Sequence, residues 1–145
     1  MPVRLIEPHE ILSRRILAID DEEANILLLR SLLEREGYGD IHTLTDPTAA
    51  AAAYADLAPD LVLLDLMMPQ IDGFQLLEAF SRHDRADEFR PVLVLTADTT
   101  LQARRRALAL GAKDFVAKPF DVIEVALRIS NLLETRILYE RLRQH

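Results

Sequence analysis

Four short apolar runs of this chain each lead into a side chain that could take part in chemistry. In an open parallel sheet the carboxyl ends of the strands share one edge, and ligands bind at that edge. If the four runs are parallel strands, the side chains that follow them belong to one site. The runs and their following residues are RILAI (15–19) with Asp20 and Asp21, LVLL (61–64) with Asp65, VLVL (92–95) with Thr96, and KDFVA (113–117) with Lys118.

Three carboxylates placed close together repel one another, which raises their pKa values unless a cation lies among them. Aspartate, water and backbone carbonyl ligands without His or Cys suit Mg²⁺. Lys118 could pair with a remaining carboxylate oxygen and would neutralise an added phosphoryl group. Because aspartate is a nucleophile that forms acyl phosphates, we expect Asp65 to be a phosphoryl acceptor. Mg²⁺, Lys118 and the Thr96 hydroxyl would then compensate the added charge.

Each of these residues also has an ordinary interpretation. Asp20 and Asp21 could cap a helix, and Asp65 could belong to the turn before Pro69. Thr96 could be a helix cap, and Lys118 could be a solvated lysine beside a turn. Coincidence of all of them at one edge is a weaker explanation than a shared site.

The elements that must position these residues alternate between apolar runs and longer segments of helical period, which is typical of βαβ units. LVLL and VLVL are uninterrupted, as expected of central strands covered on both faces. Gly37 and Gly111 are expected to end helices, whereas Asp46 and Pro47 should begin one. The pattern predicts strands at 15–19, 40–44, 61–64, 92–95 and 113–117, and five helices, at 24–36, from 47 through the alanine run, at 74–82, at 100–110 and at 121–142.

Composition limits the class of protein. The chain has 145 residues, which suits a single domain, and its net charge of -7 argues against direct binding of nucleic acid or an anionic membrane. It contains no Cys, so disulfides and thiolate zinc sites are excluded. No apolar run is long enough to cross a membrane. We expect a cytoplasmic protein.

The last predicted helix is longer than the average helix of a compact domain, which has about 11 to 12 residues. Its end is expected to project beyond the body. Leu132, Tyr139 and Leu142 recur at near-heptad spacing, although Thr135 weakens this seam. Residues 134–145 are therefore expected to be a linker or a dimerisation helix, and removal of the residues after 133 should shift a dimer to a monomer in sedimentation. Residues 1–13 are expected to form a short lead-in.

Four sequence blocks together resemble the receiver domain of response regulators, which act in two-component signal transduction. They are ILAIDDEEAN, PDLVLLDLMMPQIDGF, PVLVLTAD and GAKDFVAKPF, in the family's order and at its spacing. The resemblance covers residues 14–133. It implies an α/β fold with a doubly wound five-stranded parallel sheet in the order 2-1-3-4-5, five helices, and a last helix that is extended.

The resemblance also implies roles for individual residues. Asp65 would take a phosphoryl group from a histidine kinase or phosphotransfer protein, as a phosphoacceptor rather than as an enzyme. The resulting conformational change would regulate a partner or fused output domain through the fourth and fifth helices and the fifth strand. Mg²⁺ would be bound directly by Asp21 and Asp65, through water by Asp20, and by the Met67 carbonyl. Thr96 and Lys118 would bind phosphoryl oxygens, Thr96 and Phe115 would form the switch, and the Lys118–Pro119 bond would be cis.

Two alternatives and one open question remain at this point. A phosphatase of the haloacid-dehalogenase type also uses a strand-end Asp with Mg²⁺, but it needs a second Asp two residues later, where this chain has Met67. The chain could also be a fragment of a longer regulator, because its last helix resembles linkers to cyclic-dinucleotide enzymes. Met67 and Asp98 occupy positions that influence the lifetime of the phosphoryl group in this family, and that lifetime is open.

Overall fold

The computed structural model describes residues 6–143 and contains one five-stranded sheet. All four strand pairings are parallel, and the order is β2-β1-β3-β4-β5, which confirms the expected topology. The strands are β1 (Arg15–Ile19), β2 (Asp40–Leu44), β3 (Leu61–Leu64), β4 (Val92–Thr96) and β5 (Asp114–Ala117). β1, β3 and β4 are almost wholly buried, as their uninterrupted apolar runs predict.

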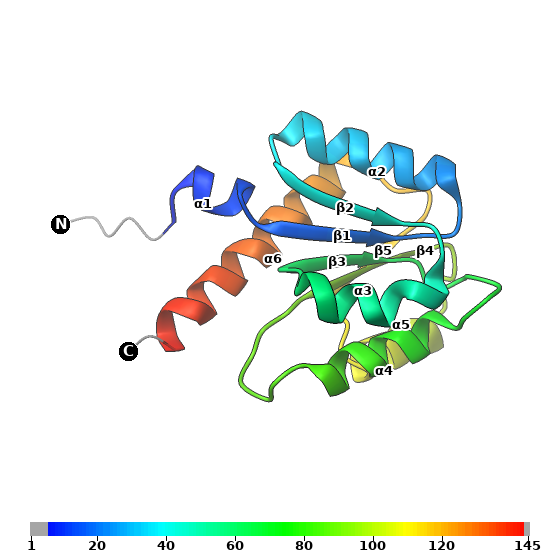
Figure 1. Ribbon diagram of the computed structural model, residues 1–145. Helices are drawn as coiled ribbons and strands as arrows, with labels where there is room; N and C mark the ends of the chain where they lie inside the picture. The colour runs from blue at the N-terminus through cyan, green and yellow to red at the C-terminus, as the bar shows by residue number, and fades with distance from the viewer. Residues whose placement is uncertain (1–5, 144–145) are drawn as a thin grey trace.

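Helices cover both faces of the sheet (Figure 1). α2 (Glu23–Glu36) and α6 (Val122–Arg143) pack on one face, around a core that includes Leu33 and Ile129. α3 (Ala50–Leu57), α4 (Gly73–His83) and α5 (Leu101–Ala109) pack on the other, around Tyr54 and Phe80, whose rings stack at 4.2 Å. Within residues 6–143, no helix combines the length and the apolar character that crossing a membrane would demand.

The turn residues expected at two helix boundaries, Gly37 and Asp46, lie at those boundaries, whereas α5 ends at Ala109, two residues before the expected Gly111. Gly37 ends α2 in the left-handed region with φ 98°, where a side chain would be strained. Asp46 accepts a hydrogen bond from the Thr48 backbone N–H at 3.0 Å, and Pro47 begins a 3₁₀ turn, Pro47–Ala49, that leads into α3. Turn chemistry in the sequence therefore located these boundaries.

The structure adds a helix that the sequence analysis did not predict. α1 (Pro8–Leu12) lies within the expected lead-in, begins with a reciprocal capping box between Glu7 and Glu10, and packs against α6. The five helices predicted from the sequence are α2 to α6. The part of the lead-in before residue 6 lies outside the described residues.

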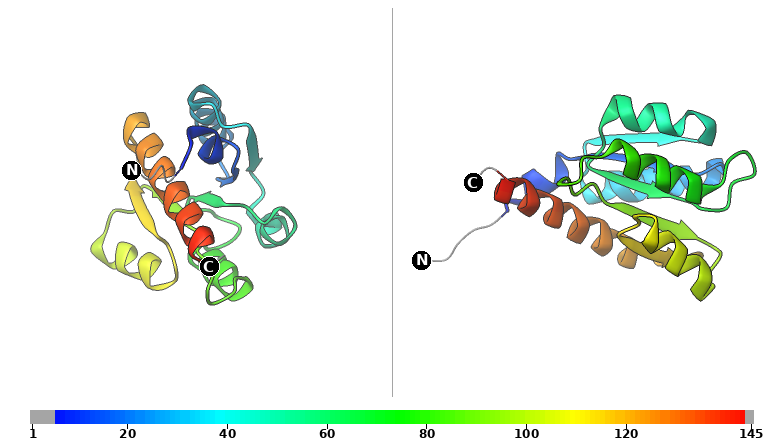
Figure 2. Two further views of the ribbon diagram at one scale, coloured as in Figure 1. Left: turned by 90° about the vertical axis from the view of Figure 1, so that its left-hand side faces the viewer. Right: turned by 90° about the horizontal axis from the view of Figure 1, so that it is seen from below.

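The end of α6 differs from the expectation of a freely projecting helix. α6 has 22 residues and runs past the edge of the sheet at which the strands begin, beside α1 (Figure 2). Its last turns nevertheless contain buried residues, namely Arg136 and Ile137, and the partly exposed Tyr139 ring stacks on Phe89, while Leu142 is exposed. The extension is therefore docked on one side and open on the other.

Candidate functional site

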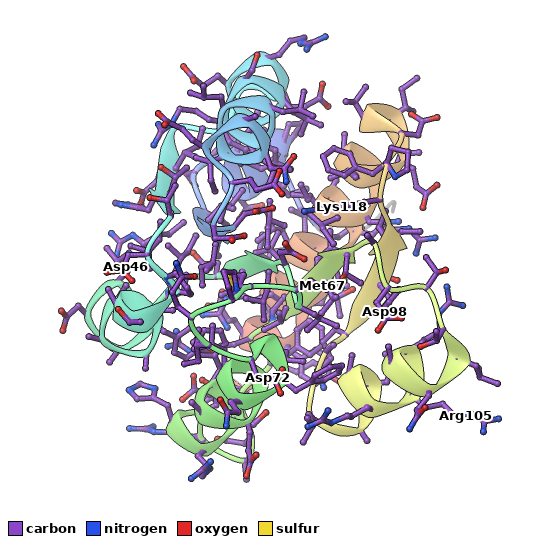
Figure 3. The ribbon with its side chains drawn as sticks, turned by 90° about the vertical axis from the view of Figure 1, so that its right-hand side faces the viewer. Asp46, Met67, Asp72, Asp98, Arg105 and Lys118 are labelled. Carbon is purple, nitrogen blue, oxygen red and sulfur yellow. The ribbon has the colours of Figure 1, made fainter. Side chains whose placement is uncertain are left out.

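The residues singled out in the sequence meet at the carboxyl edge of the sheet, which faces the viewer in Figure 3. Backbone hydrogen bonds set their positions. The Asp65 N–H donates to the Ile19 carbonyl at 3.1 Å, and the Lys118 N–H donates to the Thr96 carbonyl at 2.9 Å. The predicted convergence of Asp20, Asp21, Asp65, Thr96 and Lys118 on one edge therefore agrees with their positions in the fold.

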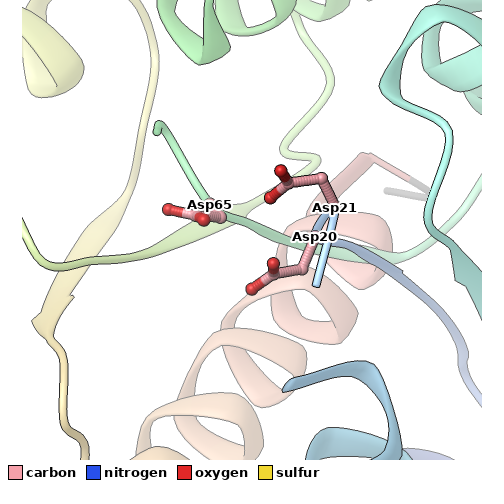
Figure 4. A group of neighbouring side chains, drawn as sticks. All are labelled: Asp20, Asp21 and Asp65. Atoms are coloured by element: carbon pink, nitrogen blue, oxygen red, sulfur yellow. The ribbon is translucent and has the colours of Figure 1, made fainter. Parts of the chain in front are cut away.

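Asp20, Asp21 and Asp65 form a compact carboxylate cluster (Figure 4). One oxygen from each lies within 4.8 Å of the others. Asp20 is 2% exposed and Asp65 is 7% exposed, so both carboxylates are removed from most of the water that would stabilise their charge. An all-oxygen set of this size, with room for water at the partly exposed Asp21, fits a hard divalent cation such as Mg²⁺.

Lys118 lies between two of these carboxylates. Its Nζ is 2.7 Å from an oxygen of Asp20 and 3.4 Å from an oxygen of Asp65. Asp20 also accepts hydrogen bonds from the Asn25 side chain at 3.1 Å and from the Glu22 N–H at 2.9 Å. Asn25 is not among the residues expected from the sequence; its place in the first turn of the helix after the acidic pair is the signal that could have indicated it.

Burial acts on the titration of this cluster. It raises the pKa of Asp65, although the Met67 N–H and the Lys118 charge act in the opposite direction. Burial by itself would lower the pKa of Lys118, but the hydrogen bond to Asp20 and the charge of Asp65 outweigh it and raise that pKa. At neutral pH the site therefore keeps a lysine cation beside a carboxylate whose charge is poorly stabilised.

We expect the Asp65→Asn variant to be more stable than the wild type at pH 7 in metal-free buffer. Because the pKa of Asp65 is raised on folding, the folded state binds more protons between the ordinary value of 3.8 and that raised value. The free energy of unfolding therefore falls as the pH rises through this window and stays lower above it. The amide of the variant carries no such charge, so its advantage should vanish at pH values below 3.8. Urea unfolding of both proteins at pH 7 and at a pH below 3.8 measures this difference. A variant less stable than the wild type at pH 7 would contradict the prediction.

Thr96 and Phe115 lie on the paired strands β4 and β5. Thr96, at the end of β4, is fully buried, and its Oγ1 accepts a hydrogen bond from the Asp98 N–H at 3.3 Å. The cap of α5 is Thr100, so the ordinary interpretation of Thr96 as a helix cap is wrong. Phe115 is buried, and the Arg104 guanidinium lies 5.2 Å from the centre of its ring. β4 and β5 thus carry Thr96 and Phe115 on adjacent strands.

The loop after Asp65 forms one wall of an open cavity of about 600 Å³, which Asp65, Met67, Asn25 and Lys118 help to line. The Met67 side chain is 58% exposed there. Gly73 holds this loop close to α4, because a Cβ at that position would lie 2.5 Å from the Leu66 Cα. A glycine is needed here because the backbones of Gly73 and Leu66 lie close together, and not because of a tight turn.

Comparison with curated proteins finds relatives that are similar to this chain over most of its length. Response regulator PleD of Caulobacter vibrioides is 38% identical over 133 residues, which cover 92% of this chain and 29% of PleD. The DNA-binding dual master transcriptional regulator RpaA of Synechocystis is 40% identical over 119 residues, which cover 82% of this chain and 48% of RpaA. The chain thus spans less than half the length of these relatives.

Solved structures agree on the fold. The receiver domain of a putative Luxo repressor protein from Vibrio parahaemolyticus superposes with a TM-score of 0.83 at 23% identity, over 92% of this chain and all of that one. A CheX–CheY–BeF₃–Mg complex from Borrelia burgdorferi contains a chain that superposes with a TM-score of 0.78 at 27% identity, over 88% of this chain and 98% of that one. A family model of the response regulator receiver domain matches residues 16–130. The chain therefore belongs to the response regulator receiver domains of two-component signalling systems.

Proposed function

We propose that the chain is a phosphorylation-dependent switch in which Asp65 accepts a phosphoryl group from a histidine kinase or phosphotransfer protein in the cytoplasm. The observation that carries the proposal is the position of Asp65. Its carboxylate is buried at the carboxyl edge of the sheet, beside two further carboxylates and 3.4 Å from the Lys118 ammonium. A nucleophile held there meets a phosphoryl donor in a site already equipped to compensate added negative charge.

The transfer would break the P–N bond of a phosphohistidine and form a P–O bond to an Asp65 oxygen. The imidazole leaves with the bonding electron pair, and the product is an acyl phosphate. Lys118 would move its charge toward the phosphoryl oxygens, and the Thr96 hydroxyl would donate a hydrogen bond to one of them. Asp20, Asp21, Asp65 and the Met67 carbonyl would hold Mg²⁺, which supplies electrostatic stabilisation of the transferring group. The Borrelia complex contains BeF₃ and Mg, which supports this choice of cation.

Hydrogen bonding supports different roles for the two neighbouring aspartates. Both oxygens of Asp20 already accept hydrogen bonds, one from Glu22 and the other from Asn25 and Lys118. Among residues 6–143 the structure gives the Asp21 carboxylate no such partner, and that side chain is partly exposed. Asp21 would therefore bind the cation directly, while Asp20 would act mainly through water.

The phosphoryl group would change the surface formed by α5, β5 and α6, the proposed contact for an output domain or partner protein. Thr96 would turn toward the phosphoryl group, and Phe115 on the neighbouring strand would follow it. A phosphoryl group can shift this equilibrium only by the difference in its interaction with the two states. The greater length of the curated relatives supports a fused output domain, and their names do not assign one to this chain.

Asp98 and Met67 bear on the lifetime of the phosphoryl group. One Asp98 oxygen accepts hydrogen bonds from the Thr100 N–H at 3.1 Å and the Thr100 hydroxyl at 2.9 Å. This holds Asp98 in the loop before α5, and Met67 has no group able to orient water. The absence of a water-orienting group at Met67 and the engagement of one Asp98 oxygen by Thr100 support a long-lived phosphoryl group.

A homodimer through Leu132, Tyr139 and Leu142 stays a prediction. Leu142 is exposed, but Leu132 packs partly buried against the core cluster of α2 and α6 and the Tyr139 ring stacks on Phe89, so only part of the proposed seam is open. Removal of the residues after 133 would also delete the buried Arg136 and Ile137, so that truncation changes the fold as well as the seam.

The test is intact mass spectrometry after incubation with acetyl phosphate, with Mg²⁺ or with EDTA, together with an assay of released phosphate. We expect a gain of one phosphoryl group that requires Mg²⁺. Free phosphate should appear no faster than the phosphoryl group is lost from the protein. Release over many turnovers would instead support the phosphatase alternative, which Met67 disfavours because it cannot serve as the general acid. Absence of any gain at saturating acetyl phosphate with Mg²⁺ would contradict the proposal.

A further inference from the structure

The second half of α6 is attached to the receiver body by a closed ring of ion pairs far from the carboxylate cluster. Two arginines and two acids form this ring, and each acid contacts both arginines. Arg136 is 2.6 Å from Asp60 and 3.5 Å from Glu140, whereas Arg14 is 3.4 Å from Asp60 and 2.7 Å from Glu140. We call Arg14, Asp60, Arg136 and Glu140 the clasp.

The clasp joins segments that are distant in sequence. Arg14 precedes β1 and Asp60 precedes β3, so both lie where strands begin, while Arg136 and Glu140 lie one turn apart on α6. Asp60 is at the opposite end of β3 from Asp65. α6 itself begins four residues after Lys118, so this one helix connects the carboxylate edge to the clasp.

Burial separates the Arg136–Asp60 pair of the clasp from ordinary surface ion pairs, whereas Arg14 and Glu140 are 25% and 33% exposed. The Arg136 and Asp60 side chains are 10% and 15% exposed. Arg136 also donates to the Phe89 carbonyl at 2.7 Å, and Asp60 also accepts from the Arg15 N–H at 2.8 Å. Loss of one charge would leave its partner poorly compensated in a site with little water, whereas loss of an exposed pair changes stability little.

Further contacts hold α6 on both sides of the clasp. On one side α1 packs against α6, Arg141 pairs with Glu10 at 2.5 Å, and Ile11 contacts the core cluster of α2 and α6. On the other side, the Tyr139 ring stacks on Phe89 at 4.9 Å. These contacts come from elements that the family model does not cover or from the loop before β4.

We propose that the clasp, together with α1, fixes the second half of α6 on the receiver body and so sets the direction in which α6 leaves it. With its last three turns held, α6 is a single rigid element that spans the domain. A segment fused after α6, or a partner helix packed against its end, would therefore keep a fixed orientation relative to the carboxyl edge of the sheet. This proposal does not depend on phosphorylation of Asp65.

The test combines spin-label distances with hydrogen exchange in the full chain. Because the chain has no Cys, nitroxides on Ala55→Cys in α3 and Leu142→Cys at the exposed end of α6 report only those two sites. We expect a narrow distance distribution in the parent and a broad one after Asp60→Asn. Amides of residues 134–143 should then exchange about ten-fold faster, while those of 122–131 keep their rates, because the opening is local.

Asp87→Asn is the matched control. Asp87 also pairs with an α6 arginine, Arg143 at 3.3 Å, but its side chain is 65% exposed, so this variant should behave as the parent. Glu140→Gln opens the ring from the other side and replaces Asp60→Asn if that variant does not fold. The proposal is overturned if the clasp variant leaves the distances and exchange rates as they are in Asp87→Asn. Neither the distances nor the exchange rates involve acetyl phosphate. The proposal for the clasp therefore fails or succeeds separately from the proposed function.

Discussion

Replacement of Asp65 by asparagine is expected to abolish the Mg²⁺-dependent mass gain from acetyl phosphate. The amide keeps the size of the side chain but cannot act as the nucleophile that forms an acyl phosphate. It also removes one of the three carboxylates that would hold the cation. The loss should be complete within detection, whereas the fold should survive, because the amide removes an unfavourable buried charge. Intact mass and circular dichroism on the same sample measure both.

Asp56→Asn is the control for this experiment. Asp56 lies in α3, is exposed and is remote from the carboxylate cluster, so it should label as the wild type does. Persistent labelling of Asp65→Asn at the wild-type level would move the acceptor to another residue. Equal loss in both variants would point to damage of the fold rather than of the site.

Replacement of Lys118 by methionine is expected to lower the free energy of unfolding at pH 7 in metal-free buffer by about 3 kcal/mol, the usual scale for removing one partner of a buried ion pair. Lys118 is 16% exposed and contacts both Asp20 and Asp65. Methionine keeps most of the stem and leaves two buried carboxylates without their cation. Because Mg²⁺ binds the same carboxylates, millimolar Mg²⁺ should restore more stability to this variant than it adds to the wild type.

Lys113→Met is the matched control, since Lys113 is the only other lysine of the chain and is exposed. Its replacement should change the free energy of unfolding by no more than about 0.5 kcal/mol and leave the response to Mg²⁺ unchanged. Urea titrations with EDTA and with Mg²⁺ measure all four conditions. Stability of Lys118→Met equal to that of Lys113→Met in EDTA would show that Lys118 does not balance the cluster.

Lys118 and the clasp lie toward opposite ends of α6. Lys118 and the cis Lys118–Pro119 bond precede the start of α6, and Arg136 and Glu140 hold its second half. A change at the carboxylate edge therefore has a continuous helix through which it could reach the far side of the domain. The Lys118→Met variant, labelled at residues 55 and 142, would measure that coupling directly.

The sequence by itself determined the sheet, its order by resemblance, and which candidate residues follow its strands at the carboxyl edge. Apolar runs such as LVLL have one stable environment, a strand buried on both faces, and the parallel arrangement sends every following residue to the same edge. Asp65, Thr96 and Lys118 could be placed together because this rule needs only the positions of the strands. Local turn chemistry at Gly37 and Asp46 likewise located helix ends.

Only the tertiary structure decided which side chains of the site form hydrogen bonds and ion pairs with one another, and which residues hold the second half of α6. The bonds of Asp20 to Asn25 and Lys118, and the place of Gly73 against Leu66, depend on distances of a few ångströms between elements. The clasp joins residues up to 126 positions apart, from Arg14 to Glu140. The local sequence pattern cannot predict such a contact. A charged residue on a helix fits the same pattern whether its side chain faces water or a buried partner.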